Sequence, residues 1–301
     1  MSSKPLTKPN LIVVRAGQNS LHPHWLNLPY ESRDFDLVVS YFNETAYKTH
    51  QPEDGVTALL VKGGKWDGLY KSFQQIPAYK DYAYIWLPDD DIDTTAGTLN
   101  EMFAQARTHD LAVCQPSLSL DSYYSHLMFL QCAGFKLRYT NYIEIMVPCL
   151  SLPVFEQVLP LFEDTMSGYG LDYLWCRLPG AGPKKAAVLD EISVHHTRPI
   201  GSQLRKSITD QKGETSEDEE ARLLRKFGDI KKAVPVAYAG ILSAGSPIEG
   251  RFKMAMVMHK GYRRRKGDFL DPAYAKRKMR QLFKRQLIKA MPLETLDSRA
   301  Q

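Results

Sequence analysis

The sequence predicts an α/β protein with a mostly parallel central sheet, helices on both of its faces and a basic, helical C-terminal extension. Short apolar runs alternate with helical patterns over about the first hundred residues, an order typical of parallel sheets. The chain of 301 residues is 44% hydrophobic and 24% charged, as expected for a folded globular protein. Between Arg251 and Lys289 there are 14 Lys and Arg but only two Asp, a charge of +12, although the whole chain carries +5.

The expected strands and helices follow one another along the chain. A strand is expected where a short apolar run ends in loop residues, and a helix where apolar residues recur every three or four positions. By these criteria the strands are 11–14, 36–42, 57–62, 82–87, 111–116, 136–147 and 186–194. The helices are 67–75, 94–109, 152–162, a segment that begins near Gly168, 217–227 and 272–291.

Three consecutive carboxylates, Asp89, Asp90 and Asp91, follow the apolar run 82–87. An open α/β sheet usually binds its ligand at the carboxyl ends of its strands. Carboxylates packed this closely repel one another unless a cation or a shifted pKa relieves the repulsion, so we expect a divalent metal held by oxygen ligands. The alternative is an acidic turn that caps the next helix, for which the sequence offers Asp93, Thr94 and Thr95.

Two further segments are expected at the same edge of the sheet. Asp172 lies in the first turn of a helix, and the pair His195–His196 ends the strand 186–194. Two carboxylates and an imidazole suit Mn²⁺ or Mg²⁺, and a carboxylate beside the metal can act as a general base. Taken alone, Asp172 also suits a carboxylate favoured by the helix dipole, and the two histidines a hydrogen-bonded loop.

The basic extension requires an acidic partner or a solvated surface. Its expected helix 272–291 has an apolar stripe bordered by Lys and Arg, a pattern found on anionic membrane surfaces. A helix docked on the body with a solvated basic face explains the pattern equally well. No apolar run approaches the ~20 residues needed to span a bilayer, and the N-terminus lacks the apolar core of a secretory signal, so a cytoplasmic protein is expected.

Five segments occur in an order that identifies a resemblance: 84–91, 115–118, 142–148, 168–172 and 188–199. They resemble an uncharacterised glycosyltransferase-like domain family found in plants and bacteria. The strand that ends in Pro-Asp-Asp-Asp-Ile is also similar to the Asp-x-Asp motif of GT-A-fold glycosyltransferases, in which two aspartates bind a divalent cation and the diphosphate of a nucleotide sugar. The resemblance covers residues 10–202 and does not reach the basic extension.

The resemblance implies a Rossmann-like GT-A fold, with residues 1–202 as the catalytic domain that binds nucleotide sugar and metal. Residues 203–301 are then a mainly helical extension that contacts the acceptor or a membrane. The implied activity is metal-dependent transfer of a sugar from a nucleotide-sugar donor to a cell-surface polysaccharide or glycolipid precursor, with inversion and with Mn²⁺ or Mg²⁺ as cofactor. Clustered aspartates would also suit a Mg²⁺-dependent nucleotidyl or phosphoryl transferase, and the basic tail a nucleic-acid-binding protein.

The resemblance also implies a role for individual residues. Asp91 would contact the metal directly, Asp89 would reach the ribose or a metal-bound water, and His196 would complete the metal site, although the adjacent His195 leaves this choice open. Asp172 would be the base that deprotonates the acceptor hydroxyl. The residues expected to contact the nucleotide sugar are Arg15 against the nucleotide, Ser40 and Tyr41 near the base, Lys65 at the diphosphate, and Asp89 and Asp90 at the strand end. Donor and acceptor choice are expected to depend on the loops 22–30, 118–136 and 201–213.

Overall fold

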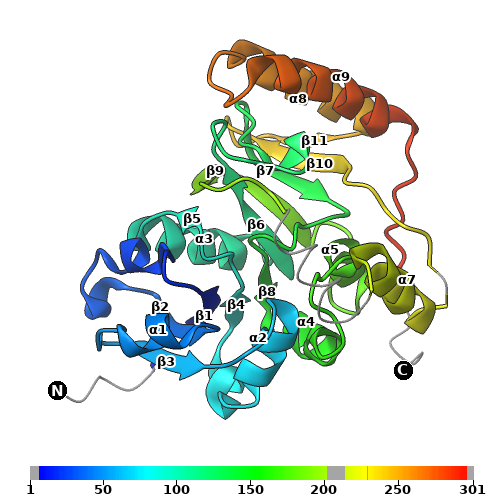
Figure 1. The fold of residues 1–301 in the computed structure, drawn as a ribbon. Coiled ribbons are helices and arrows are strands. Elements are labelled where there is room, and N and C mark those ends of the chain that lie inside the picture. Colours follow the sequence, from blue (N-terminus) through cyan, green and yellow to red (C-terminus); the bar gives the residue numbers. More distant parts are fainter. Residues whose placement is uncertain (1–6, 202–213, 229, 297–301) are drawn as a thin grey trace.

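A single sheet of eleven strands forms the centre of the molecule in the computed structural model, which describes residues 7–201, 214–228 and 230–296 (Figure 1). The strands are β1 (Asn10–Ala16), β2 (Phe35–Tyr41), β3 (Val56–Leu60), β4 (Tyr84–Trp86), β5 (Ile92–Asp93), β6 (Val113–Leu118), β7 (Phe135–Thr140), β8 (Cys149–Ser151), β9 (Ala186–His196), β10 (Ala237–Leu242) and β11 (Pro247–Glu249). Their order in the sheet is β11-β10-β7-β9-β6-β8-β4-β1-β2-β3, and β5 pairs with β9.

Most of these strands run in one direction. Parallel pairs join β1 to β2 and β4, β2 to β3, and β6 to β9. The strand β8 lies antiparallel between β4 and β6, and β7 lies antiparallel between β9 and β10. Seven described strands (β1, β2, β3, β4, β6, β9 and β10) therefore point one way, and β5, β7, β8 and β11 point the other way. The predicted α/β class with a mostly parallel central sheet is confirmed.

The helices and short 3-10 turns lie around this sheet. The α-helices are α1 (Glu44–Lys48), α2 (Trp66–Phe73), α3 (Ala96–Thr108), α4 (Leu152–Val158), α5 (Leu171–Leu174), α7 (Ser216–Lys226), α8 (Arg251–Arg264) and α9 (Pro272–Ile288), and the 3-10 turns used below are η1 (His22–Leu26) and η4 (Leu127–Phe129). Of these, α2 packs on β1 and β2, α4 on β4 and β8, and α3 on β6 and β9.

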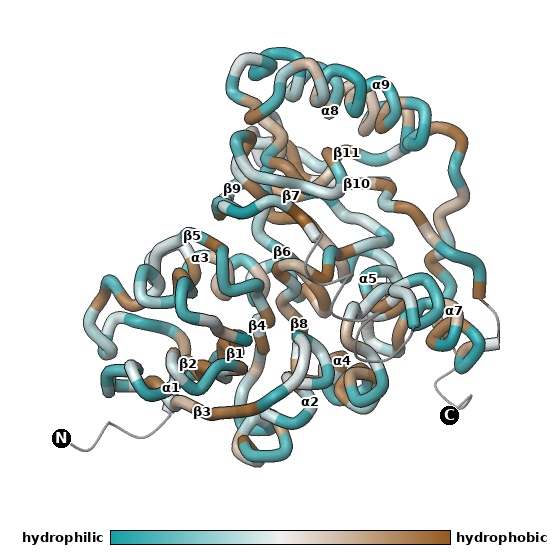
Figure 2. The backbone as a smooth tube through the Cα atoms, in the orientation of Figure 1, coloured by the Kyte–Doolittle hydropathy of each residue, from teal (hydrophilic) through white to brown (hydrophobic). Residues whose placement is uncertain are grey.

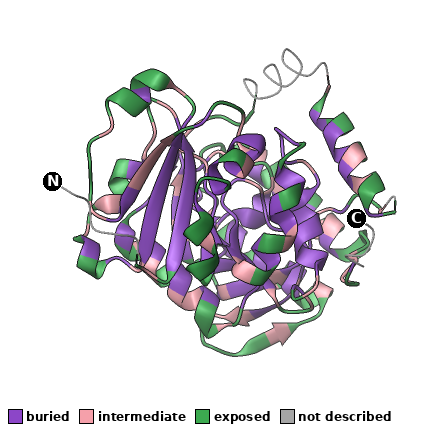
Figure 3. Ribbon diagram, turned by 90° about the horizontal axis from the view of Figure 1, so that it is seen from below, coloured by how far each residue is buried: buried purple, intermediate pink, exposed green. Residues whose placement is uncertain are grey.

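Burial of the central strands explains why they form. Every residue of β1 and β2 is buried. Because successive side chains of a strand point to opposite faces, this pattern requires that both faces of the sheet be covered. Figure 3 shows these strands in purple, beside helices with exposed outer sides, and Figure 2 shows apolar segments gathered along the same strands.

The C-terminal part of the chain is built onto the same sheet. The strands β10 and β11 form a hairpin that pairs with β7 and forms one edge of the sheet. Beyond it, α8 and α9 lie side by side at the end of the molecule farthest from β3 (Figure 1). Among the described residues, no helix is both long enough and apolar enough to cross a membrane. The proposed domain boundary at 202, and the loop 201–213 apart from Gly201, lie outside the described residues.

One expected strand differs from the structure in a way that matters for the site. The stretch 136–147 was expected to be a single strand, but β7 ends at Thr140. Asn141 instead uses its side chain to bond the backbone of Val234 and Val236, at 3.1 and 2.8 Å. The backbone N–H of Ile143 then donates to the carbonyl of Asp172 at 2.8 Å. The residues after Thr140 therefore leave the sheet, and their backbone bonds the start of α5 at Asp172.

Candidate active site

The end of β4 and the end of β9 bring two aspartates and a histidine together. β5 pairs with the last residues of β9, with Ile92 opposite His196, which places the residue before Ile92 beside the imidazole. The Nε2 atom of His196 lies 3.2 Å from Oδ2 of Asp91, and both side chains are buried. Ligand atoms of Asp89, Asp91 and His196 all lie within 4.8 Å of one another. The three residues predicted as metal ligands thus meet at one point.

The orientation of the His196 ring is determined by the backbone. Its Nδ1 lies 2.8 Å from the carbonyl oxygen of Tyr123. Because a carbonyl can only accept a hydrogen bond, Nδ1 carries the proton and Nε2 points at Asp91. A backbone carbonyl behind a histidine is the usual support of a metal-binding imidazole. The adjacent His195 pairs with Asp93 in the ladder, and its side chain leaves the opposite face of the strand. The structure therefore brings His196, rather than His195, to the cluster.

The donor set fits a divalent cation. The Oδ1 atom of Asp91 is buried and has no hydrogen-bond partner, a costly condition for a carboxylate oxygen unless a cation approaches it. Burial lowers the pKa of His196, but the hydrogen bond and the charge of Asp91 outweigh burial and raise that pKa above its usual value. The site therefore has a negative potential that attracts positive charge, which suits Mg²⁺ or Mn²⁺.

Lys65 lies beside this cluster. Its Nζ donates to Oδ1 of Asp89 at 2.6 Å and to the carbonyl oxygen of Ile145 at 2.6 Å. The lysine side chain is 15% exposed and that of Asp89 is 35% exposed. The ammonium group is thus held at the open side of the cluster, next to the carboxylate that it partly neutralises. Its expected contact with a diphosphate remains a prediction.

Asp90 points away from the other two aspartates. Its Oδ2 accepts from the backbone N–H of Gly17 at 2.9 Å, and its Oδ1 lies 3.1 Å from Nη1 of Arg198. Arg198 also donates to the carbonyl of Asn19. Burial raises the pKa of Asp90. In this arrangement Asp90 joins the loop after β1 to the end of β9, and Arg198 is a site residue that the sequence reasoning did not single out.

Arg15 and Ser40 are buried together below the loop that carries Lys65. The guanidinium group donates to Oγ of Ser40 at 2.6 Å and to the carbonyl oxygens of Val61, Gly63 and Gly64 at 2.8, 3.0 and 3.1 Å. Burial, opposed by the charge of Asp67, lowers the pKa of Arg15 to about 10. All three guanidinium nitrogens therefore have protein partners. Here Arg15 fixes the loop, and a direct contact with the nucleotide remains a prediction.

Tyr41 ends β2 in an aromatic cluster. Its hydroxyl lies 3.1 Å from Nδ1 of His50, and its ring centroid lies 6.1 Å from that of His22. Burial lowers the pKa of His22 to about 4, with the charge of His50 acting in the same direction. Burial thus favours the neutral form of His22, and the Tyr41 side chain is itself buried. The expected base contact of Tyr41 is untested.

Asp172 stands at the start of α5, after Gly170, whose φ of 96° is in the left-handed region that favours glycine. One carboxylate oxygen accepts a hydrogen bond from the hydroxyl of Tyr142. The other oxygen, Oδ1, is buried and has no partner. Burial raises the pKa of Asp172 to about 7, against the hydrogen bond from Tyr142. A carboxylate with this pKa and a free oxygen has the properties of a general base.

Glu144 is the residue that links the two parts of the site. It is buried, one of its carboxylate oxygens has no partner, and its backbone N–H donates to the side chain of Gln115 at 2.8 Å. Burial, followed by the charges of Asp172 and Asp89, raises its pKa well above the usual value. Glu144 therefore lies within electrostatic reach of both Asp172 and Asp89. The sequence signal was an acidic residue inside an apolar run, which the expected strand concealed.

The helix α7 supports the loop that precedes Asp172. The carboxylate of Glu219 accepts from the backbone N–H groups of Met166 and Ser167 at 3.0 and 2.8 Å, and from the hydroxyl of Thr165 at 3.1 Å. Burial raises the pKa of Glu219, but these hydrogen bonds have the larger combined effect in the opposite direction. The pKa of Glu219 is therefore below its usual value. Sequence reasoning missed this residue because its partners lie about fifty positions earlier in the chain.

Comparisons with protein-family models and with curated proteins find no match. Among solved structures, the chain is similar to residues 1–349 of TarS from S. aureus, with 13% identity, a TM-score of 0.47, and coverage of 93% of this chain and 90% of that chain. The complexes of the same TarS fragment with UDP-GlcNAc and with UDP match at 12% and 10% identity and TM-scores of 0.42 and 0.41, with the same coverage. Similarity at this level does not transfer a function from one chain to the other. A functional argument for this chain therefore rests on the side chains of its own site.

Proposed function

We propose that the protein is a metal-dependent glycosyltransferase, which transfers a sugar from a nucleotide-sugar donor to a cell-surface polysaccharide or glycolipid precursor with inversion. One observation carries the proposal: the ligand atoms of Asp89, Asp91 and His196 lie within 4.8 Å of one another, and a buried oxygen of Asp91 has no partner. The cluster lies at the carboxyl end of β4, where an α/β sheet usually binds its ligand.

The residues that would hold the cation are Asp91, Asp89 and His196. When bound, Mg²⁺ or Mn²⁺ neutralises negative charge on the diphosphate leaving group. Lys65, which contacts Asp89, adds a second positive group at the open side of the cluster. The chain thus combines a site for a divalent cation with a lysine that can approach the same diphosphate.

Asp172 is the base in this proposal. A sugar hydroxyl is a weak nucleophile until a carboxylate takes its proton, and the free Oδ1 of Asp172 is the atom that would accept it. With a pKa of about 7, roughly half of this group is ionised at neutral pH. Tyr142 holds the other oxygen and so fixes the direction of Oδ1. A base separate from the donor favours direct displacement, and hence inversion.

Asp91→Ala provides the test. We expect the variant to lose Mn²⁺-dependent binding of a nucleoside diphosphate, measured by calorimetry with Mn²⁺ and with EDTA. The matched control is Asp93→Ala, since Asp93 is a half-exposed carboxylate two positions away that lies 2.8 Å from His24. The metal assignment would be contradicted if the Asp91 variant bound the nucleoside diphosphate as tightly as wild type does, with Mn²⁺ and with EDTA alike.

The reaction products separate this activity from its nearest alternative. A glycosyltransferase releases a nucleoside diphosphate from a panel of nucleotide sugars. A nucleotidyl transferase instead releases pyrophosphate from a nucleoside triphosphate, and a phosphoryl transferase that acts on a nucleotide sugar releases a nucleoside monophosphate. Screening this panel with Mn²⁺ also identifies the donor.

We also infer that the outer side of α8 and α9 rests on an anionic membrane surface. Phe252, Met256 and Ile288 are 62%, 49% and 75% exposed. A shallow hollow of about 620 Å³ beside Met256 is lined by Val257, His259, Lys260, Arg263 and Arg264. Exposed apolar side chains among basic ones are typical of helices that lie on anionic lipid.

A further inference from the structure

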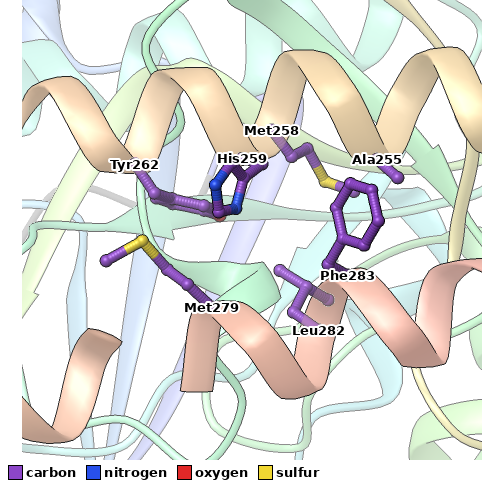
Figure 4. A pocket seen from close by; sticks show the side chains of 7 residues that line it. All are labelled: Ala255, Met258, His259, Tyr262, Met279, Leu282 and Phe283. Atoms are coloured by element: carbon purple, nitrogen blue, oxygen red, sulfur yellow. The ribbon is translucent and has the colours of Figure 1, made fainter. Parts of the chain in front are cut away.

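The helix α9 docks through one stripe of side chains. Ala275, Met279, Leu282 and Gln286 are buried, at the spacing of a single helix face. One flank of this stripe closes against α8, where Phe283 packs on His259 with ring centroids 5.7 Å apart. Figure 4 shows the side chains between the two helices, which leave a space of only about 10 Å³, the size of one water molecule. This flank is therefore filled.

The opposite flank of α9 carries Tyr274, Lys278 and Arg285, which we call the α9 flank. All three are partly buried. Lys278 and Arg285 are seven positions apart, so they lie on the same side of the helix at a separation of about 10 Å along its axis. The Tyr274 ring packs on that of Tyr124, with centroids 5.8 Å apart, and α9 contacts the turn η4. The α9 flank therefore faces the segment that contains Tyr124 and η4.

This segment is part of the candidate active site. The carbonyl that orients His196 belongs to Tyr123, next to Tyr124. Two residues further on, the ring of His126 packs on that of Tyr142, with centroids 5.6 Å apart, and Tyr142 in turn holds Asp172. The α9 flank thus borders the site from the metal end to the base end.

The charges of the flank reach into the site. Burial lowers the pKa of His126 to about 4, and the nearby charges of Arg285 and Lys278 act in the same direction. Burial lowers the pKa of Arg285 as well, and Tyr142 is the group that opposes this shift. Both cations therefore lie close to the residues around Asp172.

Neither cation has an acidic partner in the part of the chain that the structure describes, although Lys278 lies over the ring of Tyr274, with its Nζ 5.0 Å from the ring centroid. The other two partly buried cations between Arg251 and Lys289 do have polar partners, since Arg265 bonds Asp268 at 2.7 Å and Arg251 bonds the carbonyl oxygen of Gln286 at 2.7 Å. A partly buried guanidinium group is usually paired. The flank therefore has the composition of an anion site.

We propose that the acceptor is an anionic glycan, whose phosphate or carboxylate groups bind Arg285 and Lys278 while one of its hydroxyls reaches Asp172. This inference rests on the proposed function, because it assigns the flank to the acceptor of that reaction. The spacing of the two cations suits a chain with repeated negative charges. Guanidinium and ammonium groups are the side chains that bind phosphate and carboxylate best.

The test compares the double variant Lys278→Glu/Arg285→Glu with Lys276→Glu/Arg280→Glu. The control carries the same change of charge on the same helix, but at exposed positions. The probes are a fluorescein-labelled oligogalacturonate, short inorganic polyphosphate as competitor, and neutral maltohexaose, all in EDTA so that no metal recruits them to Asp91. We expect wild-type protein to bind both anionic probes, the flank variant to bind about tenfold more weakly or worse, and the control to change by less than about threefold.

Other outcomes overturn the proposal. If both variants lose the same affinity for the anionic probes, the net charge of the helix attracts the probes and the flank is not a specific site. If wild-type protein binds neither anionic probe, there is no anion site on the flank. Vesicles of phosphatidylglycerol form a second arm, and a loss confined to them would assign the flank to a lipid headgroup instead of a glycan. Nucleoside diphosphate binding with Mn²⁺ is measured on the same proteins: its absence in wild type would contradict the proposed function, while anion binding to the flank is scored separately.

Discussion

Asp172 is a buried carboxylate. Its Oδ1 atom has no hydrogen-bond partner, and its pKa is raised to about 7. Between the usual pKa of about 4 and this value, the unfolded chain releases the proton while the folded chain keeps it. The unfolded state therefore binds fewer protons, and the free energy of unfolding falls as the pH rises through this range. The proposed base is thus expected to reduce stability at neutral pH.

Asp172→Asn tests both aspects. The amide of the variant cannot ionise. The free energy of unfolding of the variant, relative to that of wild type, is therefore expected to rise by about 3 kcal/mol between pH 5 and pH 8. Urea denaturation at the two pH values measures this difference without any acceptor. The variant should retain nucleoside diphosphate binding with Mn²⁺ and lose transfer. A gain that does not depend on pH, or a turnover near that of wild type, would show that Asp172 is not the titrating base.

At the residue scale, the cluster of Asp89, Asp91 and His196 could be predicted from the sequence, whereas Glu144, which lies between Asp89 and Asp172, could not. Asp89, Asp91 and His196 follow apolar runs, and the ends of neighbouring strands meet at one edge of a sheet. Glu144 has no such signal, because its importance comes from burial beside Asp89 and Asp172. Burial of this kind depends on how residues distant in sequence pack.

At the scale of elements, the position of Asp172 depends on α7. Glu219 holds the loop Thr165–Ser167 through three hydrogen bonds, and the next residue, Glu220, accepts from the hydroxyl of Tyr173 at 3.0 Å. These contacts join a helix of the C-terminal part to the first turn of α5. Asp172, the proposed base, is therefore supported by a segment that lies beyond the region of sequence resemblance.

Glu219→Gln should weaken this support. The glutamine has one acceptor oxygen where the carboxylate has two, and its amide group would face N–H donors, so we expect a loss of about 1–3 kcal/mol in the free energy of unfolding. The exposed Glu217→Gln is the matched control and should be near neutral. Donor hydrolysis should fall more than nucleoside diphosphate binding, because Glu219 bonds the loop that precedes Asp172. Equal stability of the two variants would contradict the supporting role of Glu219.

The elements themselves were predictable where their pattern is local. Apolar runs and helical spacing predicted the strands near β1 and β2 and the helices near α3 and α9. The segment after Thr140 was wrongly expected to be a strand, because its β-forming residues are held in a loop by bonds from Asn141 to Val234 and Val236. The pairing of β10 with β7 is equally non-local, since about a hundred positions separate the two strands.

For the whole molecule, the buried contacts make the C-terminal part inseparable from the site. Arg138 of β7 and Asp190 of β9 form a fully buried ion pair at 2.7 Å, and Arg138 also contacts the hydroxyl of Tyr262 on α8 at 3.1 Å. Tyr262 donates in turn to the carbonyl of Leu130, at the end of η4. Removing α8 would leave buried polar groups without partners, which is costly. Deleting this part is therefore a poor test of what its outer surface binds.

Substitutions on the outer surface test membrane contact without disturbing these groups. Arg251, at the start of α8, donates to the carbonyl of Gln286 near the end of α9 at 2.7 Å, so Phe252 and Ile288 lie at the same end of the helix pair. Both side chains are exposed. Their replacement by serine should leave folding intact, while membrane insertion of the two side chains would stabilise binding by about 1.5–3 kcal/mol each.

We therefore expect wild-type protein to float with phosphatidylglycerol vesicles at low salt and to stay in solution with neutral phosphatidylcholine vesicles. Phe252→Ser/Ile288→Ser should reduce flotation at least about tenfold, because both apolar contacts are lost. The matched control is Phe42→Ser, since Phe42 is 44% exposed but lies near β1 and β2, at the other end of the molecule. If flotation persists in the double variant, or is equally strong with neutral vesicles, the outer side of α8 and α9 does not provide the membrane contact. A high-salt wash separates the two contributions, because salt screens the basic residues but strengthens apolar insertion.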